Sequence, residues 1–279
     1  MLFWKKKKEP IVPFEETLPP QEFNTYGLND ILHYIKREIG VDLFAKNSII
    51  ETKIKLFCER REIYSFRKLF ESIPHDKVLR QELIDLVTVN ETYFYREESQ
   101  LELAVDFAQA IKGEVKILCA PCASGEEVYS LSMMLQERKR EQNSFKITGI
   151  DINSEAIDKA QNGIFSERSL HKLEPRLKDK FFTCKDKSYQ VRREYFSSIN
   201  FTKINIFDYD FLNIGKYDII FSRNMLIYFD DEFRLKTIER FATLLKPEGK
   251  LFLGHADIIP ENSFFTKHND HRLSYYIKN

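Results

Sequence analysis

Long apolar runs are missing from this 279-residue chain, and no stretch of about 18 apolar residues is present that would span a bilayer. An excess of charge is missing as well, because 43 basic residues balance 43 acidic ones. A net charge of zero predicts no general affinity for nucleic acid or for a membrane surface. The amino-terminal MLFWKKKKEP lacks the apolar core of a secretory signal. We therefore expect a cytoplasmic protein that does not insert into a membrane.

Cysteine is scarce, with four residues in the chain, and only Cys119 and Cys122 form a C-x-x-C spacing. That spacing is found in redox pairs and in one half of a zinc site. No second C-x-x-C and no histidine pair completes a metal site, so the sequence predicts no metal. We expect the two cysteines to be small residues that pack a strand end and a loop.

The composition, with 43% hydrophobic and 31% charged residues, predicts a folded chain with a sizeable core. Residues 1–20 combine a run of lysines with four prolines, which predicts a loose tail. Residues 21–87 show helical spacing of apolar side chains, as in LNDILHYIKREIG, which ends at the predicted helix cap Gly40. We expect a small helical domain in this region.

Basic residues gather between 46 and 68, where seven cations stand against three acids. The cations are Lys46, Lys53, Lys55, Arg60, Arg61, Arg67 and Lys68. This basic stretch is either the ordinary charged face of a helix or a surface for an acidic partner, and the sequence alone favours neither.

Strand and helix patterns alternate after residue 114, with strands predicted at VKILCA, FKITGIDIN, INFTKINIFD and YDIIFSRN. Ser154 is the predicted N-cap of the helix SEAIDKAQNG. Such alternation predicts an α/β fold with a doubly wound, mostly parallel sheet over residues 98–279. Residues 88–97 are predicted to link this domain to the helical one.

Residues 162–200 break the alternation, since they are too long for a simple connection. The short aromatic-rich runs KFFTC, YQVRRE and INFTK predict a small antiparallel β insertion in this segment.

The loop CAPCASGEE follows the first predicted strand, and Asp151 ends the second. An acid in the place of Asp151 binds ribose hydroxyls in dinucleotide-binding units, although it is often only a helix cap. The loop has a single glycine, and Glu126 and Glu127 repel phosphate. They favour a cationic ligand such as S-adenosylmethionine, while the alternative is that they complement the dipole of the helix they open.

Two further clusters carry polar side chains toward the same edge of the predicted sheet. FSRNMLIYFDD places Arg223, Asn224 and Tyr228 at the end of a buried strand. TVNETYFYRE precedes the alternating domain, so Asn90, Thr92 and Arg96 are predicted to fold over the site. The following list gathers the segments that carry a wider resemblance: TVNETYFYRE, CAPCASGEEVYSL, ITGIDINSEAIDKAQNGIF and FSRNMLIYFDDEFRLKTIERFATLLKPEGKLFLGHAD.

These segments resemble, in the same order, the signatures of the CheR family of bacterial chemotaxis-receptor methyltransferases, and they cover residues 88–257. The resemblance implies a class I, Rossmann-like S-adenosylmethionine-dependent methyltransferase that converts receptor glutamates to methyl esters. It implies cofactor contacts from Asn90, Thr92, Arg96, Glu126 or Glu127, Asp151, Asn205, Ile206, Arg223 and Asn224. It also implies that Arg96 and Tyr228 lie near the transferred methyl group.

A glutamate acceptor has a pKa of about 4.3 and is already ionised at neutral pH, so no general base is required. Catalysis is then expected to be positioning and removal of water. Arg96 would orient one carboxylate oxygen, with the Tyr228 hydroxyl beside it. His255 is predicted to be structural, because no acid–base role calls for it.

One departure concerns the inserted β region, where family members that dock on a receptor tether use a glycine-rich turn. FTCKDKSYQVRREYF has no glycine, so we expect receptor binding without the tether, by a monomer, through the basic stretch. Alternatives are methylation of a non-receptor protein or of nucleic acid, and a signalling module that binds the cofactor without turnover. The neutral charge and the absence of an N/D-P-P-Y motif count against nucleic acid.

Overall fold

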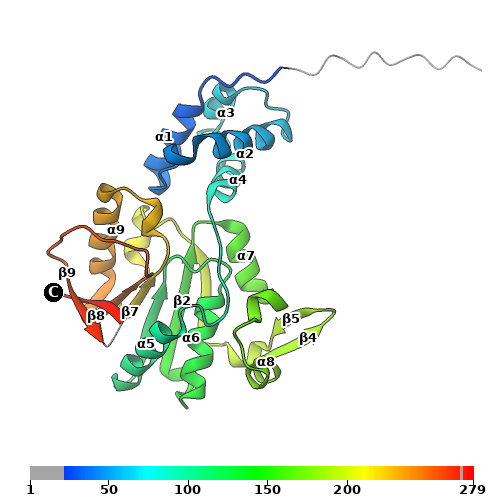
Figure 1. Cartoon of the computed structure of the whole chain (residues 1–279). Coiled ribbons are helices and arrows are strands. Elements are labelled where there is room, and N and C mark those ends of the chain that lie inside the picture. Colours follow the sequence, from blue (N-terminus) through cyan, green and yellow to red (C-terminus); the bar gives the residue numbers. More distant parts are fainter. Residues whose placement is uncertain (1–21, 271–272) are drawn as a thin grey trace, which may run out of the picture.

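The computed structural model describes residues 22–270 and 273–279. The predicted tail, residues 1–20, lies outside the described residues. Figure 1 shows a group of helices above a layered α/β domain, joined to it by one extended segment. No helix within the described ranges is long and apolar enough to cross a membrane.

The amino-terminal group contains four α-helices around their own apolar core. They are α1 (Leu28–Ile39), α2 (Asn47–Glu59), α3 (Phe66–Ser72) and α4 (Lys77–Val87). Gly40 ends α1 as predicted, because its φ of 76° is left-handed and its N–H donates to the Lys36 carbonyl. Gly40 also lies against the Phe207 and Phe233 rings, where an added Cβ would come within 2.8 and 2.9 Å.

A seven-stranded sheet forms the centre of the second domain, in the order β6-β2-β1-β7-β8-β10-β9. The strands are β1 (Val115–Cys119), β2 (Phe145–Asp151), β6 (Ile199–Lys203), β7 (Tyr217–Ser222), β8 (Leu245–Leu253), β9 (Phe265–Asp270) and β10 (Leu273–Lys278). The first five in the order are parallel, and β10 and β9 add an antiparallel edge. The predicted doubly wound, mostly parallel sheet is confirmed.

Helices cover both faces of this sheet, as the alternation of side chains along β1 shows. Ile117 and Cys119 pack in one cluster with residues of α5 (Glu98–Ala110) and α6 (Glu126–Glu137), and α7 (Ser154–Asn162) adds to the same cluster. Leu118 packs in the opposite cluster with α9 (Asp231–Leu244). The strand order reverses between β1 and β7, and ligands of such sheets bind outside the carboxyl ends of the strands at that point.

The inserted segment contains a separate three-stranded antiparallel sheet in the order β3-β5-β4, which confirms the predicted insertion. Its elements are β3 (Ile164–Ser166), α8 (Pro175–Phe181), β4 (Phe182–Lys185) and β5 (Ser188–Val191). The run INFTK was predicted both as a strand of the alternating region and as part of the insertion; it is β6 and pairs in parallel with β2, so the first prediction is confirmed and the second is wrong. A short, half-exposed edge strand has the same aromatic-rich pattern in either sheet.

The predicted N-cap of α7 was also wrong by one residue. Asn153 is the cap, and its side chain accepts from the Ala156 N–H at 2.8 Å. The Ser154 hydroxyl donates to the Asp85 carboxylate of α4, and the Ser154 N–H donates to it at 2.8 Å. Both residue types cap helices well, so tertiary contact with α4 decides between them. This contact docks the helical domain on the β2–α7 turn.

A second contact ties the end of α1 to the loop after β7. The Lys36 ammonium lies 2.9 Å from Asp42 and 2.7 Å from Asp230. The Asp42 N–H donates to the Tyr228 carbonyl at 2.8 Å. The helical domain therefore lies over the carboxyl end of the sheet and touches the segment that carries Tyr228 (Figure 1).

Replacing Lys36 with Met should lower the free energy of unfolding by about 1 kcal/mol at neutral pH, as for a partly exposed ion pair. Lys36 holds the pKa values of Asp42 and Asp230 below their usual range. The contribution of these two ion pairs to the free energy of unfolding is therefore present above the unfolded pKa of about 4. It is lost as the pH falls through the lowered pKa values of the two carboxyl groups. Urea titrations at several pH values should show the difference from wild type shrinking in acid, while exposed Lys112→Met changes little.

Candidate active site

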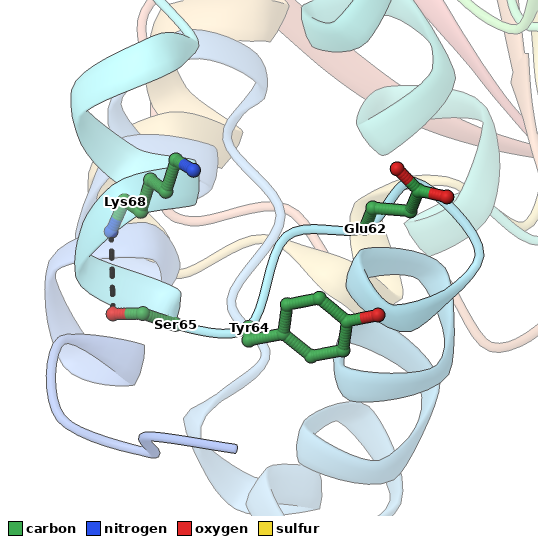
Figure 2. Close-up of a pocket in the computed structure, with 4 residues that line it drawn as sticks. All are labelled: Glu62, Tyr64, Ser65 and Lys68. Carbon is green, nitrogen blue, oxygen red and sulfur yellow. Dashed lines mark hydrogen bonds between the residues drawn. The ribbon is translucent and has the colours of Figure 1, made fainter. Parts of the chain in front are cut away.

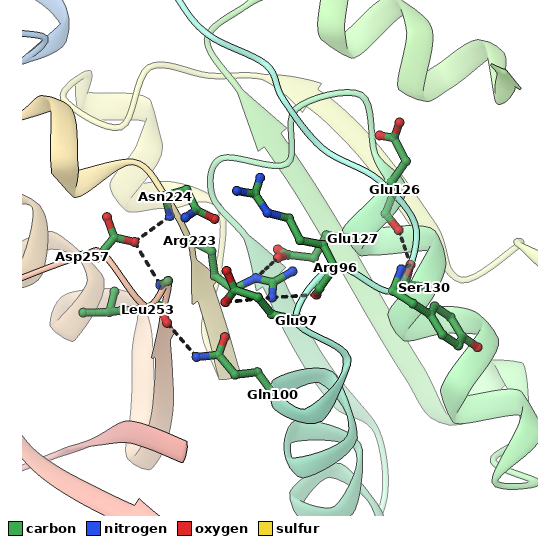
Figure 3. A network of polar contacts seen from close by, with 12 residues as sticks. Arg96, Glu97, Gln100, Glu126, Glu127, Ser130, Arg223, Asn224, Leu253 and Asp257 are labelled. Carbon is green, nitrogen blue, oxygen red and sulfur yellow. Dashed lines mark hydrogen bonds and ion pairs between the residues drawn. The ribbon is translucent and has the colours of Figure 1, made fainter. Parts of the chain in front are cut away.

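Several of the predicted site residues lie close together near the carboxyl ends of the strands, as Figure 3 shows for Arg96, Glu127 and Arg223. The loop after β1 needs its one glycine, because Gly125 has a φ of 94°. A Cβ there would come within 2.9 Å of the Ala160 Cβ and 3.0 Å of the Phe201 ring. The glycine therefore serves the turn and its packing, and a phosphate-binding role is not needed to explain it.

Asp151 holds this loop to the end of β2. Its carboxylate accepts from the Ala123 N–H at 2.8 Å and from the Asn153 N–H at 2.9 Å. Burial raises the pKa of Asp151, and the N–H groups of Asn153 and Ala123 act in the opposite direction. The structure thus places Asp151 at the predicted strand end, where its ribose contact stays a prediction.

The two adjacent acids of the loop point in different directions (Figure 3). The Glu126 carboxylate accepts from the Ser124 hydroxyl at 2.8 Å, and burial raises its pKa. The Glu127 carboxylate accepts from Arg223 Nε at 2.5 Å. Both side chains are buried. The sequence did not indicate which of the two contacts a ligand, and in the structure they differ in their hydrogen-bond partners.

Arg223 lies at the centre of a buried polar network, with only 4% of its side chain exposed. Besides Glu127, its Nη1 lies 3.5 Å from Glu97 and donates to the Arg96 carbonyl at 2.9 Å. His255 Nδ1 lies 2.9 Å from the same Glu97 carboxylate oxygen. Sequence reasoning missed Glu97, although it directly follows Arg96 in YFYRE and was available as a partner for the predicted arginines.

The segment around Arg96 has an unusual backbone. Tyr95 and Glu97 have φ values of 59° and 52°, so Arg96 stands between two left-handed residues. Its Nη1 donates to the Glu91 carbonyl at 2.6 Å. Burial raises the pKa of Tyr228, and the Arg96 charge opposes that shift. Tyr228 therefore remains a neutral hydroxyl at physiological pH, within electrostatic reach of Arg96.

Asn224 occupies the turn that leaves β7, with a left-handed φ of 60°. Its N–H donates to the Asp257 carboxylate at 2.6 Å. Its side-chain oxygen is buried without a hydrogen-bond partner among the described residues. The sequence analysis did not single out Asp257, although this acid comes shortly after the end of a strand, as the acid Asp151 stands at the end of β2.

Other predicted residues have varied surroundings. The Asn90 and Thr92 side chains are half-buried and make no hydrogen bond in the part of the chain that the structure describes. The Asn205 amide donates to the Glu38 carbonyl at 2.9 Å, so it contacts the end of α1. Ile206 is buried in the cluster beneath α9. Their cofactor contacts stay predictions.

Cys119 and Cys122 are free thiols buried in the core, which confirms their packing role. Burial raises the pKa of both thiols. The described residues contain no group of three or more histidine, cysteine or acidic side chains arranged to hold a metal.

The sheet order, the reversal at β1 and β7, and a loop with acids where a phosphate site has glycines define a class I S-adenosylmethionine-dependent methyltransferase. The family model described as "CheR methyltransferase, SAM binding domain" matches residues 90–273. The chain therefore belongs to the CheR methyltransferase family, and its cofactor is S-adenosylmethionine.

Among curated proteins, the chain is 39% identical over 268 residues to the "Chemotaxis protein methyltransferase" of Campylobacter jejuni strain 81-176, covering 95% of this chain and 99% of that protein. "Chemotaxis protein methyltransferase 2" of Vibrio cholerae is 37% identical over 239 residues, covering 80% and 82%. A solved structure of the Streptomyces viridochromogenes rRNA methyltransferase aviRa is similar with a TM-score of 0.45 and 11% identity, covering 69% and 87%.

Arg223→Met should lower the free energy of unfolding by about 3–5 kcal/mol, because it leaves the buried Glu127 and the partly buried Glu97 carboxylates without their cation. Adding Glu127→Gln to that variant should recover part of the loss, since one uncompensated charge is then removed. Urea denaturation measures both changes. Arg138→Met, which breaks an exposed pair with Asp106, is the control; an equal loss in that control would contradict the central role of Arg223.

Proposed function

We propose that this chain is a protein-glutamate O-methyltransferase that esterifies chemotaxis receptors. The observation that carries the proposal is the placement of Arg96 and Tyr228 beside the Arg223–Asn224 turn, at the carboxyl edge of a methyltransferase sheet. The curated relatives, which are chemotaxis protein methyltransferases by name, support a receptor as the acceptor.

The site fits S-adenosylmethionine by charge and by hydrogen-bonding capacity. Glu127 and the buried oxygen of Asn224 are acceptors that suit the ammonium of a methionine group, and Asp151 suits a ribose. We assign Glu127 to the methionine end, because it faces the Arg223 side of the crevice, whereas Glu126 faces Ser124. No lysine stands in the loop after β1, as a phosphate site would favour.

When bound, S-adenosylmethionine supplies the sulfonium methyl group that an acceptor takes up. The chain has to orient the acceptor carboxylate and exclude water, since that carboxylate is ionised at neutral pH. Arg96 offers a charged planar donor for one carboxylate oxygen, and the Tyr228 hydroxyl offers a neutral one. Tyr228 keeps its proton because burial raises its pKa.

Incubation with methyl-labelled S-adenosylmethionine and receptor-containing membranes tests the function. We expect base-labile label on receptor glutamates, because carboxyl methyl esters hydrolyse in base. Label on another protein or on nucleic acid would replace this function with a rival one. Binding of the cofactor without any transfer would point to a signalling module.

Tyr228→Phe should lower kcat by about 10- to 100-fold, which is the effect of losing one hydrogen bond to a charged group. Affinity for S-adenosylhomocysteine should stay within about twofold of wild type, because the hydroxyl is assigned to the acceptor. Transfer rates and calorimetry measure the two effects. Tyr209→Phe is the control, since Tyr209 is 77% exposed. Unchanged kcat in Tyr228→Phe would remove the hydroxyl from the mechanism.

The basic stretch runs from the residue before α2, through the turn after it, to α3, and is proposed as the receptor contact. Lys53, Arg60 and Lys68 are exposed and have no ion-pair partner among the described residues, whereas Arg61 pairs with Glu82. The side chain of Lys46 lies outside the described residues. A hollow of about 280 Å³ on this surface is lined by Glu62, Tyr64, Ser65 and Lys68, and Figure 2 shows these four residues. The hollow is distant from the strand ends and offers a partner side chain a place to dock.

Reversing Arg60 and Arg61 to Glu should lower the rate of receptor methylation by about tenfold, because it removes cations from a surface proposed to meet acidic helices. Cofactor affinity should not change. The matched control reverses two other exposed cations, Lys112 and Lys139, and should leave methylation intact. Equal methylation by the Arg60 and Arg61 variant would remove this surface from the receptor contact.

The insertion makes a tight turn without glycine, since Asp186 and Lys187 both adopt left-handed φ values between β4 and β5. We propose that receptor recognition does not use a tether at this turn. Calorimetric titration with a receptor carboxyl-terminal peptide should show no micromolar binding.

A further inference from the structure

Asp257 follows β8 and is almost fully buried. Its Oδ2 accepts from the Asn224 N–H at 2.6 Å and from the Gly254 N–H at 2.9 Å. Its Oδ1 accepts from the Ile227 N–H at 3.2 Å. One carboxylate therefore receives three backbone donors from two loops, and two of those donors flank the turn that leaves β7.

The Asn224 backbone depends on a support of this kind. Its left-handed φ of 60° is tolerated by asparagine but is disfavoured for residues without a local polar side chain. Gly254 leaves no room for a Cβ, which would come within 2.8 Å of the Asn224 nitrogen and 3.0 Å of its side-chain Nδ2. The ends of β7 and β8 are thus held in close contact, with the Asp257 carboxylate between them (Figure 3).

The same carboxylate reaches the segment that carries the Tyr228 hydroxyl. Ile227, whose N–H it binds, precedes Tyr228 in the short helical turn 226–228. Asp257 therefore holds the loop backbone from which two side chains extend. One is Asn224, whose buried side-chain oxygen has no hydrogen-bond partner among the described residues, and the other is Tyr228.

We propose that Asp257 is a positioning residue for methyl transfer, which holds Asn224 in its left-handed conformation so that the Asn224 amide meets the methionine end of the cofactor. This inference rests on the proposed function for the identity of the reaction. Whatever the acceptor, residues 257 and 224 are then coupled in cofactor binding. Asp257 acts through the backbone, because both of its oxygens are taken by N–H groups.

Asp257→Asn preserves shape but replaces one acceptor oxygen with an NH2 group, which faces backbone donors. We expect affinity for S-adenosylhomocysteine, measured by calorimetry, to fall by about tenfold or more, as for a misplaced binding group. Asp76→Asn is the control, because Asp76 accepts two backbone N–H groups at the start of α4, in the helical domain. Cofactor affinity should be unchanged in that control, which separates positioning from a general loss of stability.

Two variants at position 224 test whether Asp257 acts through the Asn224 side chain. Asn224→Gly and Asn224→Ala both remove the amide, and glycine also adopts the left-handed φ without cost. Adding Asp257→Asn to either variant should change cofactor affinity by less than about threefold, because the amide that Asp257 positions is absent. With wild type and Asp257→Asn, these variants form two double-mutant cycles.

A further loss of about tenfold when Asp257→Asn is added to either position-224 variant would overturn the proposal, and so would wild-type affinity in Asp257→Asn itself. These measurements use the cofactor product alone, so they do not depend on the acceptor. Failure to methylate receptors would count against the proposed function, while the affinity cycles would still decide the role of Asp257.

Discussion

The buried guanidinium of Arg223 is the interaction on which the site depends. A buried charge is tolerated only when opposite charges and hydrogen bonds compensate its lost hydration. Glu127, Glu97 and the Arg96 carbonyl provide that compensation from two different segments. One segment starts α6 and the other links the two domains, so the Arg223 side chain at the end of β7 fixes the relative positions of all three places. The cofactor crevice is therefore a consequence of charge pairing as well as of sheet topology.

The same network explains why the linker can be strained. Tyr95 and Glu97 are held in left-handed conformations that cost free energy outside glycine. The Tyr95 N–H donates to the buried Ser130 hydroxyl at 3.0 Å, and Glu97 pairs with Arg223, so contacts on both sides over-determine the backbone. Arg96, between them, is directed by its neighbours, and the helical domain is attached to the same short segment. The placement of the domains and the geometry of the candidate site depend on the same contacts.

Much of this arrangement was predictable from sequence because carboxyl ends of parallel strands meet at one edge. Asp151, Glu127 and Arg223 each follow a recognisable buried strand. Sequence could not reveal which oxygen meets which donor. Glu97 and Asp257 act only through contacts between distant segments, and the choice of Asn153 over Ser154 as a cap depended on α4. Local pattern predicted the elements and the edge, whereas tertiary contact determined the partners.

The charges around the candidate site favour a ligand that carries a positive charge. Among the described residues that surround it are five carboxylates, from Glu97, Glu126, Glu127, Asp151 and Asp257, and two guanidiniums, from Arg96 and Arg223. Burial raises the pKa of Glu126, Asp151 and Asp257, because each carboxylate pays for lost hydration. A ligand that brings a positive charge relieves this cost.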